Sequence, residues 1–262
     1  MALRHTLGWD PNFLQRSPWF WPLSAAAMRF ESYRDWPSRD DLGWAYAALA
    51  QLSDAEPLRF AENVRKQDRF AGGGFRAERL YDGRITCAGE VPTREGDWHD
   101  FFNALCFMTF PRAKRALHRR QFKVLAERIE PGVQRLPGAR TKEQDALTLF
   151  DEGGAVIAAQ DAAYPELAAA SDAERPALLQ QLLDQRQARV IPFGHALFEH
   201  LVEGLRCPGG STRLLRVEDV RVPDAQLLAA VDRGVAALLS DPSVFREPRE
   251  GAHVRLAEIG LS

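Results

Sequence analysis

The chain has 262 residues, of which 45% are hydrophobic and 27% are charged, and its formal net charge is −2. This composition is typical of a globular protein with a sizeable core, and the length allows one large domain or two that pack closely. The small net charge excludes a polycation that would bind nucleic acid or a membrane surface along its whole length.

Neither a disulfide framework nor a membrane span is predicted. Cys87, Cys106 and Cys207 form no CxxC pair, and their odd number argues against a disulfide-linked scaffold or partner and against a zinc knuckle. Reduced thiols predict a cytoplasmic protein. The apolar run SPWFWPLSAAAM at residues 17–28 contains two prolines and is too short to cross a bilayer.

The N-terminal segment, residues 1–37, is rich in aromatic side chains. We expect it to pack on the rest of a single globular domain that spans residues 1–262, with an exposed patch for a partner subunit as the alternative. A helix should begin after Ser38, because Asp41 follows three residues later as in a capping box. The aromatic residues concerned are Trp9, Phe13, Trp19, Phe20 and Trp21.

Residues 72–88 carry a turn signal. The pair Asp82-Gly83 separates two short apolar segments and predicts a β-hairpin, because Asp-Gly readily adopts the positive φ of a tight turn. The glycines at 72–74 lack the Lys-Ser/Thr that follows a phosphate-binding loop, so we interpret them as a flexible lead into the hairpin.

Two helices separated by Pro111 should follow. The first, within GDWHDFFNALCFMTF at residues 96–110, is apolar nearly all round, which predicts burial, and Asp97 is its expected N-cap. The second, at about residues 112–129, is rich in Arg and Lys and should end at PGVQRLPG.

The second half of the chain alternates predicted strands and helices. Strands are expected at residues 147–150, 155–159, 189–194 and 213–222, and turns or loops at residues 151–154 and 207–212. Helices are expected at residues 171–187, 195–204 and 223–241, the first with Ser171 and Glu174 as a capping box. Together these elements predict one α+β domain in which several helices pack on short antiparallel hairpins.

The first turn of the buried helix holds the best candidate for a catalytic or metal-binding residue. His99, Asn103 and Cys106 share one helix face, and the positive end of the helix dipole should keep the His99 imidazole neutral, as a general base or metal ligand requires. Asp100 could join this site or simply stabilise the helix start. The alternative is that the polar face only braces the core, with Cys106 as a small core residue.

A second histidine has a similar position. His195 follows a strand and a glycine at the start of a predicted helix, and Glu199 lies one turn later, so both could bind one metal ion. Asp151 and Glu152 could supply further ligands, although acidic residues are also common in turns before glycine. No HExxH, Walker, GxSxG or Rossmann pattern is present.

The basic helix suggests a different function. Its cations could bind RNA phosphates or an acidic protein partner, but Phe122 is its only aromatic residue for base stacking. The cations can equally be the solvated face of a helix with a buried apolar stripe, and we expect His118 on that same surface. The arginines that would form the binding surface are Arg112, Arg115, Arg119 and Arg120.

Three segments carry a resemblance to a known family. They are WHDFFNALCFMTFPRAKRALH at residues 98–118, DALTLFDEGG at 145–154 and FGHALFEHL at 193–201. In this order and spacing they resemble a bacterial, proteobacterial family that is catalogued only as a domain of unknown function. The resemblance implies no activity and assigns no catalytic residue. At Cys106 the family resembles a bulky apolar position, which argues against a cysteine nucleophile.

These patterns favour two hypotheses. The first is a hydrolase for a small-molecule substrate that uses either a divalent metal cofactor or acid–base catalysis by histidine and carboxylate groups. It requires His99 and His195 to lie within about 10 Å of each other, because metal–His bonds are near 2 Å. The second hypothesis is a non-catalytic binding module that uses the basic helix. The residues expected to line the hydrolase pocket are His99, Asp100, Asn103, His195 and Asp151 or Glu152.

Overall fold

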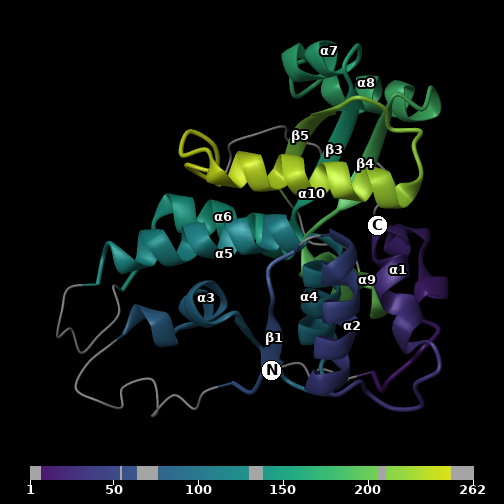
Figure 1. Ribbon diagram of the computed structural model, residues 1–262. Coiled ribbons are helices and arrows are strands. Elements are labelled where there is room, and N and C mark those ends of the chain that lie inside the picture. The colour runs from purple at the N-terminus through teal and green to yellow at the C-terminus, as the bar shows by residue number, and fades with distance from the viewer. Residues whose placement is uncertain (1–6, 54, 64–75, 130–137, 206–210, 249–262) are drawn as a thin grey trace.

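The computed structural model describes residues 7–53, 55–63, 76–129, 138–205 and 211–248 (Figure 1). The α-helices are α1 Ser24–Ala27, α2 Arg39–Ser53, α3 Tyr81–Gly83, α4 Trp98–Thr109, α5 Pro111–Ala126, α6 Lys142–Gly153, α7 Tyr164–Ala169, α8 Arg175–Asp184, α9 His195–Val202 and α10 Asp224–Ser240. The strands are β1 Arg59–Ala61, β2 Glu90–Pro92, β3 Ala155–Gln160, β4 Ala188–Pro192 and β5 Thr212–Val217. Helices thus combine with small sheets, and the predicted α+β class is confirmed.

The larger sheet has the strand order β4-β3-β5. Strand β3 runs antiparallel to β4 and parallel to β5, whereas β1 and β2 form a separate parallel pair. Helices α7 and α8 lie between β3 and β4 in the chain, so the antiparallel pair is not a hairpin. The register pairs Ala155 with Pro192, which places the start of β3 beside the end of β4.

Strand β3 is buried on both faces. Ala155, Ile157 and Ala159 face a first hydrophobic core, which also includes residues of α4, α8 and α9. Val156 and Ala158 face a second core with residues of α5, α6 and α10. Figure 1 shows α10 lying across the sheet with α5 and α6 beside it. The alternation follows from the two-residue period of a strand.

Most of the N-terminal aromatic residues pack on the first core, whereas Trp21 packs against the second. Trp9 stacks on Trp98 of α4 with ring centroids 5.4 Å apart, and Phe20 stacks on Phe102 at 5.6 Å. Phe13 is almost completely buried and meets the rings of Phe20, Trp98 and Phe102 edge-on. These rings fix the start of α4, from which His99 projects.

Several predicted helix boundaries are confirmed. The Asp97 side chain caps α4 by accepting a hydrogen bond from the Asp100 backbone N–H, and Pro111 begins α5. Ser38 and Asp41 bind each other at the start of α2, as predicted. Ser171 and Glu174 also bind each other, but α8 begins only after this pair, at Arg175. The glycine run 72–74, most of PGVQRLPG and most of CPGGST lie outside the described residues.

The predicted hairpin at Asp82-Gly83 is wrong. This segment is helical: a 3₁₀ turn at Ala77–Arg79 leads into α3, and a π-helix follows at Arg84–Ala88. Gly83 has a right-handed φ of −67° and serves close packing, because a Cβ there would lie 2.1 Å from the Ala77 carbonyl oxygen. The Asp82 side chain binds His118 of α5 at 2.8 Å. A tertiary contact therefore overrides the local turn preference.

The predicted strand at residues 147–150 is also wrong. These residues continue α6, which begins at a Thr141–Gln144 capping box and runs through the expected turn at 151–154 as far as Gly153. Ala146, Leu147 and Phe150 are buried in the second core at helical spacing. Short apolar runs fit either a strand or a buried helix, and here the upstream cap decides.

No helix within the described ranges is long and apolar enough to cross a membrane. Cys87 is exposed, Cys106 is buried, and both are free thiols. Burial raises the pKa of Cys106 to about 12, so it stays protonated as a small core residue.

Candidate functional site

The pairing of β3 with β4 brings two candidate residues together. Glu152 lies just before β3, and His195 lies just after β4. Between them the Gly154 carbonyl accepts hydrogen bonds from the backbone N–H groups of Phe193 and Gly194, at 2.9 and 2.8 Å. A Cβ at Gly194 would lie 2.4 Å from the Glu152 carbonyl oxygen, so glycine is required for this close approach.

Helix α4 supplies the third residue. It packs against α9 (Figure 1), so that His99 in its first turn meets both His195 and Glu199. His99 Nδ1 lies 2.9 Å from Glu199 Oε2, and His99 Nε2 lies 3.1 Å from His195 Nε2. The two histidines are therefore well within the distance that a shared metal ion requires.

His99, His195 and Glu152 form a triangle of potential ligand atoms. Glu152 Oε2 lies 3.4 Å from His195 Nε2 and 3.9 Å from His99 Nε2, and the two Nε2 atoms are 3.1 Å apart. The circle through these three atoms has a radius of about 2 Å, which matches the usual bonds of Zn²⁺ to histidine nitrogen and carboxylate oxygen. This spacing would allow one metal ion to contact two histidines and one carboxylate.

Glu199 orients His99 in this triangle. A carboxylate can only accept, so the 2.9 Å contact places a proton on His99 Nδ1 and directs Nε2 at the other ligands. Burial lowers the pKa of His99, but the hydrogen bond to Glu199 and the charge of Glu152 outweigh it and raise the pKa above its usual value. The neighbouring carboxylates thus act against the effect expected from the helix dipole.

His195 differs from His99 in its protonation. Burial lowers its pKa well below the usual range, and the charges of Lys114 and His99 act in the same direction. With His195 neutral, one of the two Nε2 atoms carries a proton and the other accepts it at 3.1 Å, so one proton lies between the two rings. A cation that bound both Nε2 atoms would displace that proton.

Asp151 lies behind the triangle, paired with a buried lysine. Its carboxylate accepts from Lys114 Nζ at 2.5 Å, and the Lys114 side chain is fully buried. Burial alone would raise the pKa of Asp151, but the Lys114 charge holds it well below its usual value. Asp151 Oδ2 is 3.9 Å from His195 Nδ1, which is too long for a direct hydrogen bond. Asp151 thus places a negative charge beside His195 without binding it directly.

Asp100 and Asn103 have partners of their own. Both carboxylate oxygens of Asp100 accept from Arg94, each at 2.9 Å from the guanidinium. Asn103 Nδ2 donates to the Tyr81 hydroxyl at 2.7 Å, and Asn103 Oδ1 is buried and makes no hydrogen bond with the described residues. The predicted residues thus gather at one place but divide into separate pairs.

A pocket of about 290 Å³ opens on this cluster. Four residues of its wall were not predicted from the sequence: Tyr81 was expected in a hairpin, Pro92 ends the short strand β2, and Asn63 and Arg94 lie in connecting segments without a motif. Arg94 could have been predicted from its spacing to Asp97 and Asp100, to which it is paired. The lining residues are Asn63, Tyr81, Pro92, Arg94, His99, Asp100, Asn103, Asp151, Glu152 and His195.

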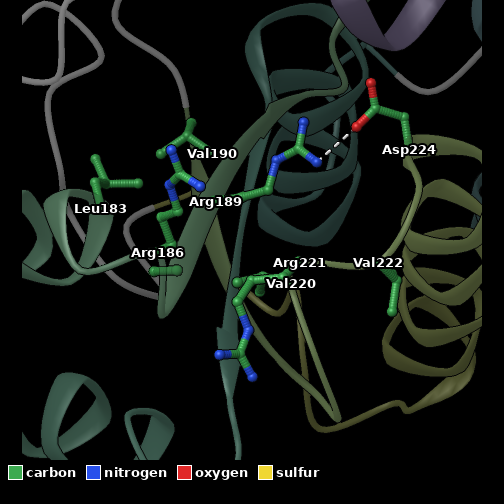
Figure 2. A pocket seen from close by; sticks show the side chains of 9 residues that line it. Leu183, Arg186, Arg189, Val190, Val220, Arg221, Val222 and Asp224 are labelled. Carbon is green, nitrogen blue, oxygen red and sulfur yellow. Dashed lines mark hydrogen bonds and ion pairs between the residues drawn. The ribbon is translucent and has the colours of Figure 1, made fainter.

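A larger groove of about 480 Å³ lies near the start of β4, at the other end of that strand (Figure 2). Three arginines contribute to it, and Figure 2 shows Arg189 directed at Asp224, to which it donates at 2.7 Å. Arg221 binds Asp219. Its lining contains no histidine, so the ligand triangle and the chemistry that it supports belong to the smaller pocket.

The basic helix, α5, is largely engaged within the protein. Arg115 and Arg119 bind Glu56, and Arg120 binds Glu143. Arg112 is the second residue of the helix, and its backbone N–H donates to Asp232. The expected solvated face is wrong for Lys114, which is fully buried, and for His118, which is 2% exposed and bound to Asp82. Binding of RNA or an acidic partner by these arginines stays a prediction.

Comparison with known proteins identifies a family. Residues 69–256 match the family described as protein of unknown function DUF3025. This match covers well over half of the chain and includes every member of the ligand triangle, so the chain belongs to that family. No match was found among curated proteins or among solved structures.

Proposed function

We propose that this member of the DUF3025 family binds one divalent metal ion through His99, His195 and Glu152 and uses it to activate water for hydrolysis. The single observation that carries the proposal is the ligand triangle. Its three atoms, contributed by α4, α9 and the last turn of α6, can all lie about 2 Å from one central point.

The surroundings support a catalytic rather than a structural metal ion. A structural zinc site is closed by four protein ligands, whereas three ligands leave a position for water or substrate. The pocket of about 290 Å³ provides space on that side. Glu199 supplies the carboxylate partner that histidine ligands commonly have, which fixes the ring and increases its basicity.

The chemistry then follows from the bound ion and the wall of the pocket. A divalent ion lowers the pKa of its bound water towards neutrality and polarises a carbonyl or phosphoryl oxygen. His195 is buried and neutral, as a ligand must be, and Tyr81 presents a hydroxyl to the same pocket. Hydrolysis needs only substrate and water, so the site is complete without a further co-substrate.

Metal titration tests the proposal. Protein stripped with a chelator should bind one equivalent of Zn²⁺, Mn²⁺ or Co²⁺ in calorimetry, and elemental analysis of the freshly purified protein identifies the natural ion. The variants His99→Ala and His195→Ala should each lose at least about a hundredfold in affinity, since each removes one of three ligands. The matched control is His200→Ala, which changes a histidine of α9, the helix of His195, that lies outside the triangle.

Circular dichroism and thermal melting establish that each variant is folded. The proposal fails if both histidine variants fold and still bind metal with wild-type affinity. It also fails if the loaded protein hydrolyses no small ester, amide or phosphate ester faster than the His99→Ala variant does.

A further inference from the structure

One polar pair in the pocket has no role in holding the metal ion. Tyr81 and Asn103 both line the pocket, and Asn103 Nδ2 donates to the Tyr81 hydroxyl at 2.7 Å. Asn103 sits one helical turn after His99 on the same face of α4, so the pair lies beside the ligand triangle. The Tyr81 ring rests against His118, which Asp82 holds in place.

The pair leaves one donor and one acceptor unused. Tyr81 accepts from Asn103, so its own O–H proton is free to donate, while Asn103 Oδ1 is buried without a hydrogen bond among the described residues. A tyrosine hydroxyl keeps this proton at neutral pH, because its ordinary pKa is about 10. A buried acceptor without a partner is costly, so a ligand group that donates to it would be favoured.

We propose that the substrate is a small amide, recognised by Tyr81 and Asn103. An amide carries a carbonyl acceptor and an N–H donor on adjacent atoms, which complements the Tyr81 O–H and Asn103 Oδ1. Turning the Asn103 side chain over exchanges the donor and the acceptor but leaves one of each, so the complement is the same. An ester or a phosphate ester has no N–H group and would leave one atom of Asn103 unpaired.

The inference rests on the proposed hydrolytic function and specifies its reaction. The oxygen of the activated water forms a bond to the amide carbonyl carbon, and the C–N bond breaks with its electron pair going to nitrogen. One proton of the water ends on the leaving nitrogen, which departs as an amine. The other proton is released as the acid product ionises to a carboxylate.

A matched pair of probes tests the substrate class. Acetanilide and phenyl acetate have nearly the same shape and differ in the N–H group, and both are small enough for a pocket of about 290 Å³. Rates and binding are measured with the Zn²⁺-loaded full chain. Because esters are intrinsically more reactive, the informative quantity is the ratio of the two kcat/KM values and how each variant changes it.

Two variants separate the roles of the pair. Asn103→Leu removes the partner of the amide N–H, so it should lower kcat/KM for acetanilide at least about fivefold more than for phenyl acetate. Tyr81→Phe removes a hydrogen bond to the carbonyl that both probes share, so it should lower both values by similar factors. A ratio that both Asn103→Leu and Tyr81→Phe leave within twofold of wild type would overturn the inference, because with the Asn103 amide turned over it is Tyr81 that accepts from the substrate N–H.

The proposed function is judged separately. Zn²⁺ affinity, measured in parallel, reports on the ligand triangle. If the loaded protein hydrolyses neither probe, the amide inference is decided by binding: wild type must bind acetanilide at least about fivefold more tightly than Asn103→Leu or Tyr81→Phe does, with no such change for phenyl acetate. Equal losses for both probes would overturn it.

Discussion

Replacing Lys114 with methionine should strongly destabilise the protein. Met has nearly the length of Lys but no charge, so the substitution isolates the ammonium group, which is fully buried between Asp151 and the Phe107 ring. Removing one partner of a buried ion pair leaves an uncompensated charge, which costs about 3–5 kcal/mol. For a chain of this size that corresponds to a fall in Tm on the order of 10 °C.

Urea denaturation at pH 7 measures this loss directly. The matched control is Arg119→Met on the same helix: its side chain is 51% exposed and paired with Glu56, so the loss should stay below about 1 kcal/mol. The double variant Lys114→Met/Asp151→Asn should recover about 1 kcal/mol or more relative to Lys114→Met, because the stranded carboxylate becomes a neutral amide. The reasoning is refuted if Lys114→Met costs no more than Arg119→Met, or if the second substitution adds a further loss.

Three other predictions concern the site and its support. Glu199→Gln should weaken Zn²⁺ binding about 10- to 100-fold in calorimetry, because the carboxylate that orients His99 is lost, and unchanged affinity would show that it has no such role. Gly194→Ala should cost about 1–3 kcal/mol in urea denaturation and weaken metal binding, since its Cβ must push the Glu152 backbone away, whereas Gly43→Ala, with open space around it, should do neither. Burial raises the pKa of Asp232 from 3.8 to about 6, so the folded state binds this proton more tightly than the unfolded state, and the resulting stability is lost as pH rises through about 6. Relative to Asp232→Asn, wild type should therefore lose about 2–3 kcal/mol of unfolding free energy between pH 4 and pH 7, and a constant difference would contradict the assignment.

The sequence pattern singled out the residues of the candidate site, but it did not predict which of them contact one another. His99, His195 and Glu152 stood out because each begins or ends an element next to other acidic or histidine residues. Their partners depend on how α4 and α9 cross, which no local pattern reveals. For this reason Glu199, expected to share a metal with its own helix neighbour His195, instead holds His99 across the helix interface.

The fold was predictable where local signals were strong and acted alone. The caps at Asp97 and Ser38 and the break at Pro111 set helix boundaries that tertiary contacts did not alter. At Asp82-Gly83 a local turn preference competed with the contact to His118, and the contact prevailed. Tyr81 was missed along with that segment, although it borders the pocket.

The register of β3 against β4 has a consequence for how the chain tolerates change. Glu152 lies three residues before Ala155 of β3, His195 lies three residues after Pro192 of β4, and Ala155 and Pro192 are paired in the sheet. A residue inserted at Gly154 or Gly194 would therefore shift one of the two ligands by about one strand step of 3.3 Å. The crossover through α7 and α8 lies at the opposite end of the same strands, where added or deleted residues leave the paired ends in place. Length variation and engineered insertions should therefore be accepted in that crossover and rejected beside the ligands, which makes the far end of the sheet the natural position for a label or a fused domain.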